Sequence, residues 1–189
     1  MRQRSVHPRD LLQLPTAITA GSLGLVYDGS NHIDTTRGKV EVAVGRFGDV
    51  VDGYVARKYD MVSDAGAIAD ATSDKLGMAV IGRALWKHDI APKPVLLAIA
   101  ARNLMNAGAT LYNGLHDPEK QAIRPPKEGK YAMAADNISL GAFMVADSLK
   151  EKPTAYKIAR GIGYTAAIVG AVVGLKATKR YLCGEFDTV

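Results

Sequence analysis

The chain has 189 residues, a net charge of +5 and 48% hydrophobic residues. This length suits a single domain that covers residues 1–189. The only cysteine, Cys183, excludes an intramolecular disulfide. The polar residues that follow Met1 predict no cleavable signal peptide.

Six long helical segments, joined by short polar connections, are predicted. In chain order they cover residues 11–27, 40–56, 66–86, 94–112, 131–149 and 158–176. No stretch of 18 uncharged residues occurs, so hydropathy alone favours a soluble helical protein. The segments are long enough to span a bilayer if inward-facing charges are allowed, and they are rich in the small residues of packed membrane helices. We therefore expect an all-α polytopic membrane protein with about six transmembrane helices.

The connections between these segments differ in positive charge. Turn residues predict loops at 28–39, 87–94 and 113–130, and a short polar connection at 57–64. With the N-terminus inside, the interior connections carry twelve Lys and Arg residues and the exterior ones carry seven. Cytoplasmic loops are enriched in Lys and Arg, so this bias places the N-terminus and the 57–64 connection in the cytoplasm. In a bacterium the membrane would be the inner, cytoplasmic one.

Several charged residues fall inside the predicted spans. Glu41, Arg46 and Arg83 have no evident partner in the sequence, and they are the strongest argument against six full spans. Charged side chains within a membrane normally face a cavity or one another. Snorkelling and an oligomer interface are the two explanations left open for these three residues.

Eight residues at fixed spacings distinguish the second and third segments. They are Asp49, Asp52, Gly53, Ala56, Arg57, Gly66, Asp70 and Asp74. Asp49, Asp52 and Ala56 fall on one face of a helix, and the last three members recur every fourth residue on a second helix. Two helices joined by a short connection are expected to lie side by side, so the four carboxylates can converge.

Four converging carboxylates repel one another strongly unless cations lie among them. Mg²⁺ and Mn²⁺ prefer oxygen ligands, and two such ions can clamp a diphosphate during a displacement reaction. We therefore expect a two-metal site held by Asp49, Asp52, Asp70 and Asp74. An all-α isoprenoid synthase also binds diphosphate through helical Asp residues, but such enzymes resemble Asp-Asp-x-x-Asp, and this chain has no adjacent Asp pair.

The uncharged members of the motif are small. Gly53, Ala56 and Gly66 allow two helices, or a helix and a ligand, to approach closely. Arg57 places a fixed cation beside the carboxylates, where it can hold phosphate oxygens.

The spacing of these eight residues resembles the signature of the CDP-alcohol phosphotransferases (CDP-alcohol phosphatidyltransferases), membrane enzymes that make phospholipids. The resemblance implies transfer of a phosphatidyl group from CDP-diacylglycerol to the hydroxyl of a small alcohol, with release of CMP. It favours a phosphorylated acceptor, glycerol-3-phosphate, as in the relatives that make phosphatidylglycerophosphate. Relatives that use inositol phosphate usually have a more Arg-rich entry to the fifth helix, which is absent here.

The same resemblance implies roles for the motif residues. Asp49, Asp52 and Asp70 would mainly bind the metals. Asp74 would take the proton from the acceptor hydroxyl and also contact the second metal. The nucleotide pocket would be shaped by Gly53, Ala56, Arg57 and Gly66.

Two basic residues outside the motif are candidates for binding the acceptor phosphate. The relatives commonly have a Gly-Lys pair entering the fifth helix, which Gly129 and Lys130 match. They also have an Arg in the fourth helix, for which Arg102 is the candidate. A Gly-Lys pair before a helix is common, and Arg102 is equally consistent with a structural ion pair.

The first helix departs from its relatives. They often begin it with Asn-x-x-Thr-x-x-Arg, whereas this chain has Asp10, Gln13 and Thr16. The alternatives that stay open are another acceptor (inositol phosphate, inositol, serine or a lipid alcohol), an inactive membrane homologue and a soluble metal-dependent protein. The expected partners are the substrates and the bilayer, with no nucleic acid. Members of the family often pair as homodimers, which this sequence neither requires nor excludes.

Overall fold

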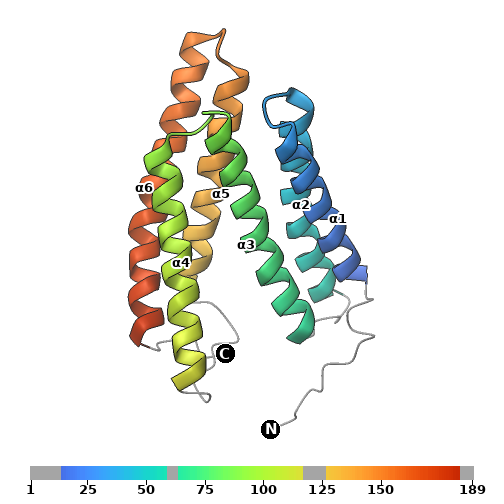
Figure 1. Cartoon of the computed structure of the whole chain (residues 1–189), viewed down its shortest axis with the longest axis vertical. Helices are drawn as coiled ribbons and strands as arrows, with labels where there is room; N and C mark the ends of the chain where they lie inside the picture. The colour runs from blue at the N-terminus through green and yellow to red at the C-terminus, as the bar shows by residue number, and fades with distance from the viewer. Residues whose placement is uncertain (1–13, 59–63, 117–126, 184–189) are drawn as a thin grey trace. The chain divides into compact units, whose positions relative to one another are not determined.

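A computed structural model describes residues 14–58, 64–116 and 127–183 of the chain. Within these ranges the backbone alone is described at 14–17, 49–50, 52–57, 64–71, 110–111, 113–116 and 181–182. The described residues form six α-helices (Figure 1). They are α1 (Leu14–Asn31), α2 (Thr36–Lys58), α3 (Asp64–Lys87), α4 (Lys93–His116), α5 (Lys127–Ser148) and α6 (Pro153–Cys183). The prediction of an all-α chain with six helices is confirmed.

The predicted loop over 28–39 is wrong over most of its length. Helix α1 continues to Asn31 and α2 begins at Thr36, so only four residues connect them. The glycines there are packing residues, because a Cβ on Gly29 would lie 2.6 Å from the carbonyl oxygen of Gly38. Thr35 caps α2, since its Oγ1 accepts a hydrogen bond of 3.0 Å from the Gly38 N–H.

The predicted loop over 113–130 is also shorter at both ends. Helix α4 runs to His116 and α5 begins at Lys127, while residues 117–126 lie outside the described residues. The connection between α3 and α4 agrees with the prediction over 87–94. It contains Asp89, whose φ of 51° lies in the left-handed region that Asp tolerates better than most residues.

Contacts divide the chain into two compact units, residues 1–88 and 89–189. In the first unit, α1 packs along α2 and, less extensively, along α3, while α2 and α3 contact each other directly at few positions. Its core contains the buried side chains of Val26, Ile33, Val42, Ile81 and Leu85. The expectation that the second and third helices lie directly side by side is therefore met only locally, because α1 supplies most of the packing surface for both.

The contact between α1 and α2 depends on small residues. A Cβ on Gly45 would lie 2.6 Å from the carbonyl oxygen of Ser22, and Gly48 also lies against the Ser22 side chain. Ser22 itself is buried. Close backbone approach through Gly and Ser is typical of helices packed within a membrane.

In the second unit, α6 packs against α5 and against α4 (Figure 1). Phe143 of α5 is fully buried and lies edge-on to the ring of Tyr164, with the ring centroids 5.3 Å apart. Gly163 of α6 makes room for the Phe143 ring, because a Cβ there would lie 3.0 Å from it. The hydroxyl of Ser139 donates a 2.8 Å hydrogen bond to the carbonyl oxygen of Gly163, which joins α5 to α6.

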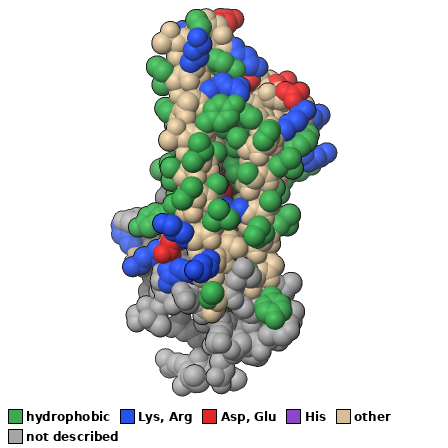
Figure 2. All heavy atoms as spheres, turned by 90° about the vertical axis from the view of Figure 1, so that its left-hand side faces the viewer, with side chains coloured by type: hydrophobic (Ala, Val, Ile, Leu, Met, Phe, Trp, Pro, Cys, Tyr) green, Lys and Arg blue, Asp and Glu red, His purple; other side chains and the backbone are tan. Residues whose placement is uncertain are grey.

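One helix in the described part of the chain, over Pro153–Arg180, is long and apolar enough to cross a membrane by length and composition. Large hydrophobic side chains are nevertheless exposed on every helix, including Leu25, Phe47, Leu76, Leu104, Ile138 and Ile168. Figure 2 shows hydrophobic side chains spread over the face on which α6 lies, with many of the charged side chains towards the ends. Six transmembrane spans remain a prediction, considered below with the proposed function.

Candidate active site

All eight motif residues lie on the two helices predicted to carry them. Asp49, Asp52, Gly53, Ala56 and Arg57 lie in the C-terminal half of α2, and Gly66, Asp70 and Asp74 lie in the N-terminal half of α3. Helix α2 extends at least to Lys58 and α3 starts at Asp64, so the predicted helix–connection–helix arrangement is confirmed at the level of the backbone.

Asp74 is the one motif residue whose side chain the structure describes. Only the backbone is described for the other seven, which include the predicted metal ligands Asp49, Asp52 and Asp70. Among the side chains that are described, no group of three or more His, Cys, Asp or Glu could hold a metal ion. The two-metal site therefore stays a prediction.

Asp74 forms an ion pair with Arg46, a residue for which the sequence indicated no role. Its Oδ1 accepts a hydrogen bond from Nη2 of Arg46 on α2, and the two side chains are only 18% and 17% exposed. This contact joins α2 to α3, which otherwise touch little. It accounts for Arg46, one of the three charges that argued against membrane spans, because a paired charge costs less in a membrane than an isolated one.

The guanidinium of Arg46 reaches α3 beside Gly77 as well as Asp74. A Cβ on Gly77 of α3 would lie 3.4 Å from Nη1 of Arg46 and 3.8 Å from Val26 of α1. Gly77 is one turn beyond Asp74 and is itself buried, and a Cβ there would be in ordinary van der Waals contact with the guanidinium. The sequence carried one usable signal for this contact: Arg46 lies three residues before Asp49, on the same side of α2.

The other two unexplained charges are now placed. Nε of Arg37 donates a 2.7 Å hydrogen bond to Oε1 of Glu41, one turn along α2. The Arg37 side chain is 78% exposed, whereas the Glu41 side chain is 17% exposed. Arg83 is exposed on α3.

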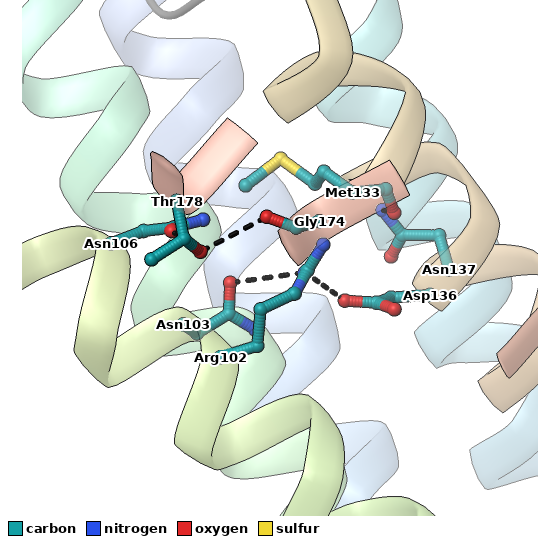
Figure 3. A network of polar contacts seen from close by, with 8 residues as sticks. All are labelled: Arg102, Asn103, Asn106, Met133, Asp136, Asn137, Gly174 and Thr178. Carbon is teal, nitrogen blue, oxygen red and sulfur yellow. Dashed lines mark hydrogen bonds and ion pairs between the residues drawn. The ribbon is translucent and has the colours of Figure 1, made fainter. Parts of the chain in front are cut away.

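Arg102 lies in a polar network inside the second unit (Figure 3). Its Nη2 donates to Oδ2 of Asp136 on α5 and, at 3.3 Å, to Oδ1 of Asn103. The Arg102 and Asp136 side chains are 8% and 2% exposed. Its Nε and Nη1 atoms are buried and have no hydrogen-bond partner among the described residues. The structural ion pair left open for Arg102 is therefore present.

Helix α6 is shaped to fit this pair. A Cβ on Gly174 would lie 2.9 Å from Nη1 of Arg102, and a Cβ on Gly170 would lie 2.6 Å from Oδ1 of Asp136. One turn further on, Oγ1 of Thr178 lies 2.6 Å from Oδ1 of Asn106 and 3.0 Å from the Gly174 carbonyl oxygen (Figure 3). The unpaired N–H groups of Arg102 thus face the backbone of α6.

Lys130 lies in the first turn of α5 and is exposed. Nearby in the sequence, Glu128 forms a 2.6 Å ion pair with Arg180, near the end of α6. That pair ties the start of α5 to the end of α6, and the same two helix ends also carry Lys127, Lys176 and Lys179. This end of the second unit is therefore positively charged, as expected for the cytoplasmic side or for a phosphate site.

Comparison with known proteins places the chain in a family. The model of the CDP-alcohol phosphatidyltransferase family matches residues 14–174, a span that contains all eight motif residues. The chain is also similar to a protein of Schizosaccharomyces pombe described as a cardiolipin synthase (CMP-forming) / mitochondrial hydrolase fusion protein. The two are 35% identical over 66 residues, which is 35% of this chain and 11% of the fusion protein. The family match covers most of the chain, and the chain therefore belongs to the CDP-alcohol phosphatidyltransferase family.

Proposed function

We propose that this chain is a divalent-metal-dependent phosphatidyltransferase that uses glycerol-3-phosphate as its acceptor, forms phosphatidylglycerophosphate and releases CMP. The observation that carries the proposal is the complete eight-residue motif on α2 and α3, within a family match over residues 14–174. The choice of acceptor rests on the resemblance described above and on Gly129 and Lys130 at the start of α5.

The donor set of the motif fits hard divalent ions. Asp49, Asp52, Asp70 and Asp74 would hold two Mg²⁺ or Mn²⁺ ions, since carboxylate oxygens are the ligands these ions prefer. Bound there, the ions would neutralise the negative charge of the donor diphosphate. Gly53, Ala56 and Gly66 leave space for the cytidine nucleotide, and Arg57 holds its phosphate oxygens.

The chain's own residues supply the proton chemistry. The acceptor hydroxyl attacks the phosphorus on the lipid side of the diphosphate, the bond to the CMP oxygen breaks, and Asp74 takes the hydroxyl proton. Carboxylates are weak bases, so the orientation of Asp74 towards the hydroxyl matters. Lys130 and Arg102 are the candidates for the acceptor phosphate. Lys130 is exposed and available, whereas Arg102 would have to share its guanidinium between the phosphate and Asp136.

We also propose that all six helices span the membrane, with the N-terminus and the active site on the cytoplasmic side. Exposed large hydrophobic side chains on every helix support this, because a soluble protein seldom exposes so much apolar surface. The charges that lower the hydropathy of α2 to α5 are partly neutralised by pairing, as in Arg46 with Asp74 and Arg102 with Asp136. Residues 1–189 would then form one membrane domain.

The test is CMP release by the detergent-purified protein from CDP-diacylglycerol, with Mg²⁺ or Mn²⁺ and with EDTA. The acceptors would be glycerol-3-phosphate, inositol phosphate, inositol, serine and phosphatidylglycerol. Metal-dependent release with glycerol-3-phosphate alone is expected. Release with a different acceptor would retain the reaction and reassign the product. No release with any acceptor, from folded protein, would favour an inactive homologue.

A second acceptor has a specific observation in its favour. The 66-residue similarity is to a protein described as a cardiolipin synthase (CMP-forming), whose product requires a lipid alcohol as acceptor. Phosphatidylglycerol in the acceptor panel tests this alternative directly. If phosphatidylglycerol is the acceptor, CMP release should require it and should not occur with glycerol-3-phosphate, which separates the two possibilities.

A further inference from the structure

Arg46 and Asp74 are the only ion pair between α2 and α3 that the described residues show, and they lie 28 positions apart in the sequence. Both side chains are mostly buried, with 17% and 18% of their surfaces exposed. A charged side chain that is mostly buried is costly unless it is paired. The contact is therefore a structural ion pair of this unit and not an incidental surface contact.

The geometry around Arg46 restricts its guanidinium. Its Nη1 lies beside Gly77 of α3, one turn beyond Asp74, where a Cβ on Gly77 would be 3.4 Å from it. Gly45, the residue before Arg46, is pressed against the Ser22 carbonyl of α1, which limits movement of α2 at this point. Close packing of α2 against α1 at Gly45 therefore holds the backbone that carries the donor, and the donor engages one carboxylate oxygen of Asp74, Oδ1.

We infer that Arg46 is a positioning residue for Asp74: its hydrogen bond to Oδ1 fixes the carboxylate rotamer so that Oδ2 is presented to the acceptor hydroxyl. The inference rests on the proposed function, in which Asp74 takes the hydroxyl proton. A planar guanidinium anchored at both sides restrains a carboxylate in a way that a flexible ammonium group cannot. Arg46 also places one positive charge beside the carboxylate of Asp74, so the charge of Asp74 is paired.

The contact itself is tested without metal or substrate. Thermal unfolding of the detergent-purified protein in EDTA would be measured for Arg46→Met, Asp74→Ala and the double variant. If the pair exists, the losses of stability in the two single variants should sum to more than the loss of stability in the double variant. Additive losses would overturn the inference. This readout does not depend on activity, so it separates a failure of the contact from a failure of the proposed function.

The role of the contact is tested by kinetics and metal binding together. Arg46→Met is expected to lower kcat by about 10- to 100-fold, the size of effect that misplacing a reacting group produces. KM for CDP-diacylglycerol, and Mn²⁺ affinity measured by electron paramagnetic resonance, are expected to stay within about threefold, since the metal ligands are retained. Arg46→Lys keeps the charge and is expected to recover part of kcat. Arg37→Met, which breaks an exposed pair on the same helix, serves as the matched control and should leave kcat unchanged.

Three results would overturn the role. One is a normal kcat in Arg46→Met. Another is a loss of Mn²⁺ affinity as large as the loss of kcat, which would make Arg46 a support for the metal site. The third is an equal kcat loss in Arg37→Met. If Arg46→Met does not fold, Arg46→Lys carries the test, with a reduced kcat at unchanged Mn²⁺ affinity as the expected result. Absence of metal-dependent CMP release by the unmodified chain would reject the proposed function, and the role of Arg46 in it, while the unfolding cycle would still report the contact.

Discussion

Arg102 of α4 donates a hydrogen bond to Asp136 of α5 inside the second unit, and their side chains are 8% and 2% exposed. Helix α6 meets both partners with glycine, Gly174 against the guanidinium and Gly170 against the carboxylate. Three helices are thus joined around one ion pair. The first two predictions concern this arrangement.

Removing one member of the pair leaves the other charge buried and unpartnered. Asp136→Ala is expected to lower the free energy of unfolding by about 3–5 kcal/mol, whereas Arg102→Met combined with Asp136→Leu is expected to recover most of that loss. Thermal unfolding in detergent measures both. Lys93→Met, which breaks an exposed pair with Asp89, is the control and should change stability by about 1 kcal/mol or less. A double variant as unstable as Asp136→Ala would contradict this account.

The glycines of α6 differ in how much room surrounds them. Gly174→Ala and Gly170→Ala each force a Cβ against a buried charged side chain, and each is expected to cost about 1–3 kcal/mol. Gly161→Ala on the same helix meets nothing within 4 Å, so it should stabilise the protein by up to about 1 kcal/mol through helix propensity. The melting temperatures of the three variants give the comparison. Equal effects at positions 161 and 174 would mean that the close approach to Arg102 is not present in the protein.

Asp74→Asn separates proton transfer from structure at the candidate active site. The amide keeps an oxygen that can accept from Arg46, so the α2–α3 contact and the fold should survive. Loss of the base is expected to lower CMP release by about 100-fold or more. Activity is measured beside a melting curve for the same preparation. Near-normal turnover would remove Asp74 from the role of base.

Lys130→Ala tests the acceptor site. Loss of a charge-assisted hydrogen bond to a phosphate, about 1.5–3 kcal/mol, corresponds to a rise of about tenfold or more in KM for glycerol-3-phosphate. KM for CDP-diacylglycerol should not change. Lys127→Ala, in the same turn of α5, is the matched control. An unchanged acceptor KM would place the phosphate elsewhere.

The helices and the family were predictable because both depend on local order in the sequence. The motif residues are spaced for helix faces, and α2 and α3 carry them as predicted. The loop over 28–39 was predicted wrongly because Gly29 and Gly38 were taken as turn residues, whereas they allow two helices to meet. Helix α6 begins earlier than predicted, at Pro153. Proline suits the first turn of a helix, because the N–H that it lacks would make no hydrogen bond within the helix at that position.

The ion pairs were not predictable, for a different reason. Arg46 and Asp74 are 28 residues apart, and Arg102 and Asp136 are 34 apart. Whether two such residues meet depends on how each helix is rotated about its own axis, and no local spacing in the sequence determines that rotation. The charges that made the spans look improbable were therefore visible in the sequence, but their partners were not.

The glycines of α6 limit which amino-acid substitutions this helix can tolerate. Gly163, Gly170 and Gly174 lie against α5 and α4, whereas Ile168 and Val172 are exposed. In a large pool of functional variants, the exposed positions should accept many different apolar residues. The glycine side should stay constant, so that tolerated changes recur with the period of the helix and record its orientation.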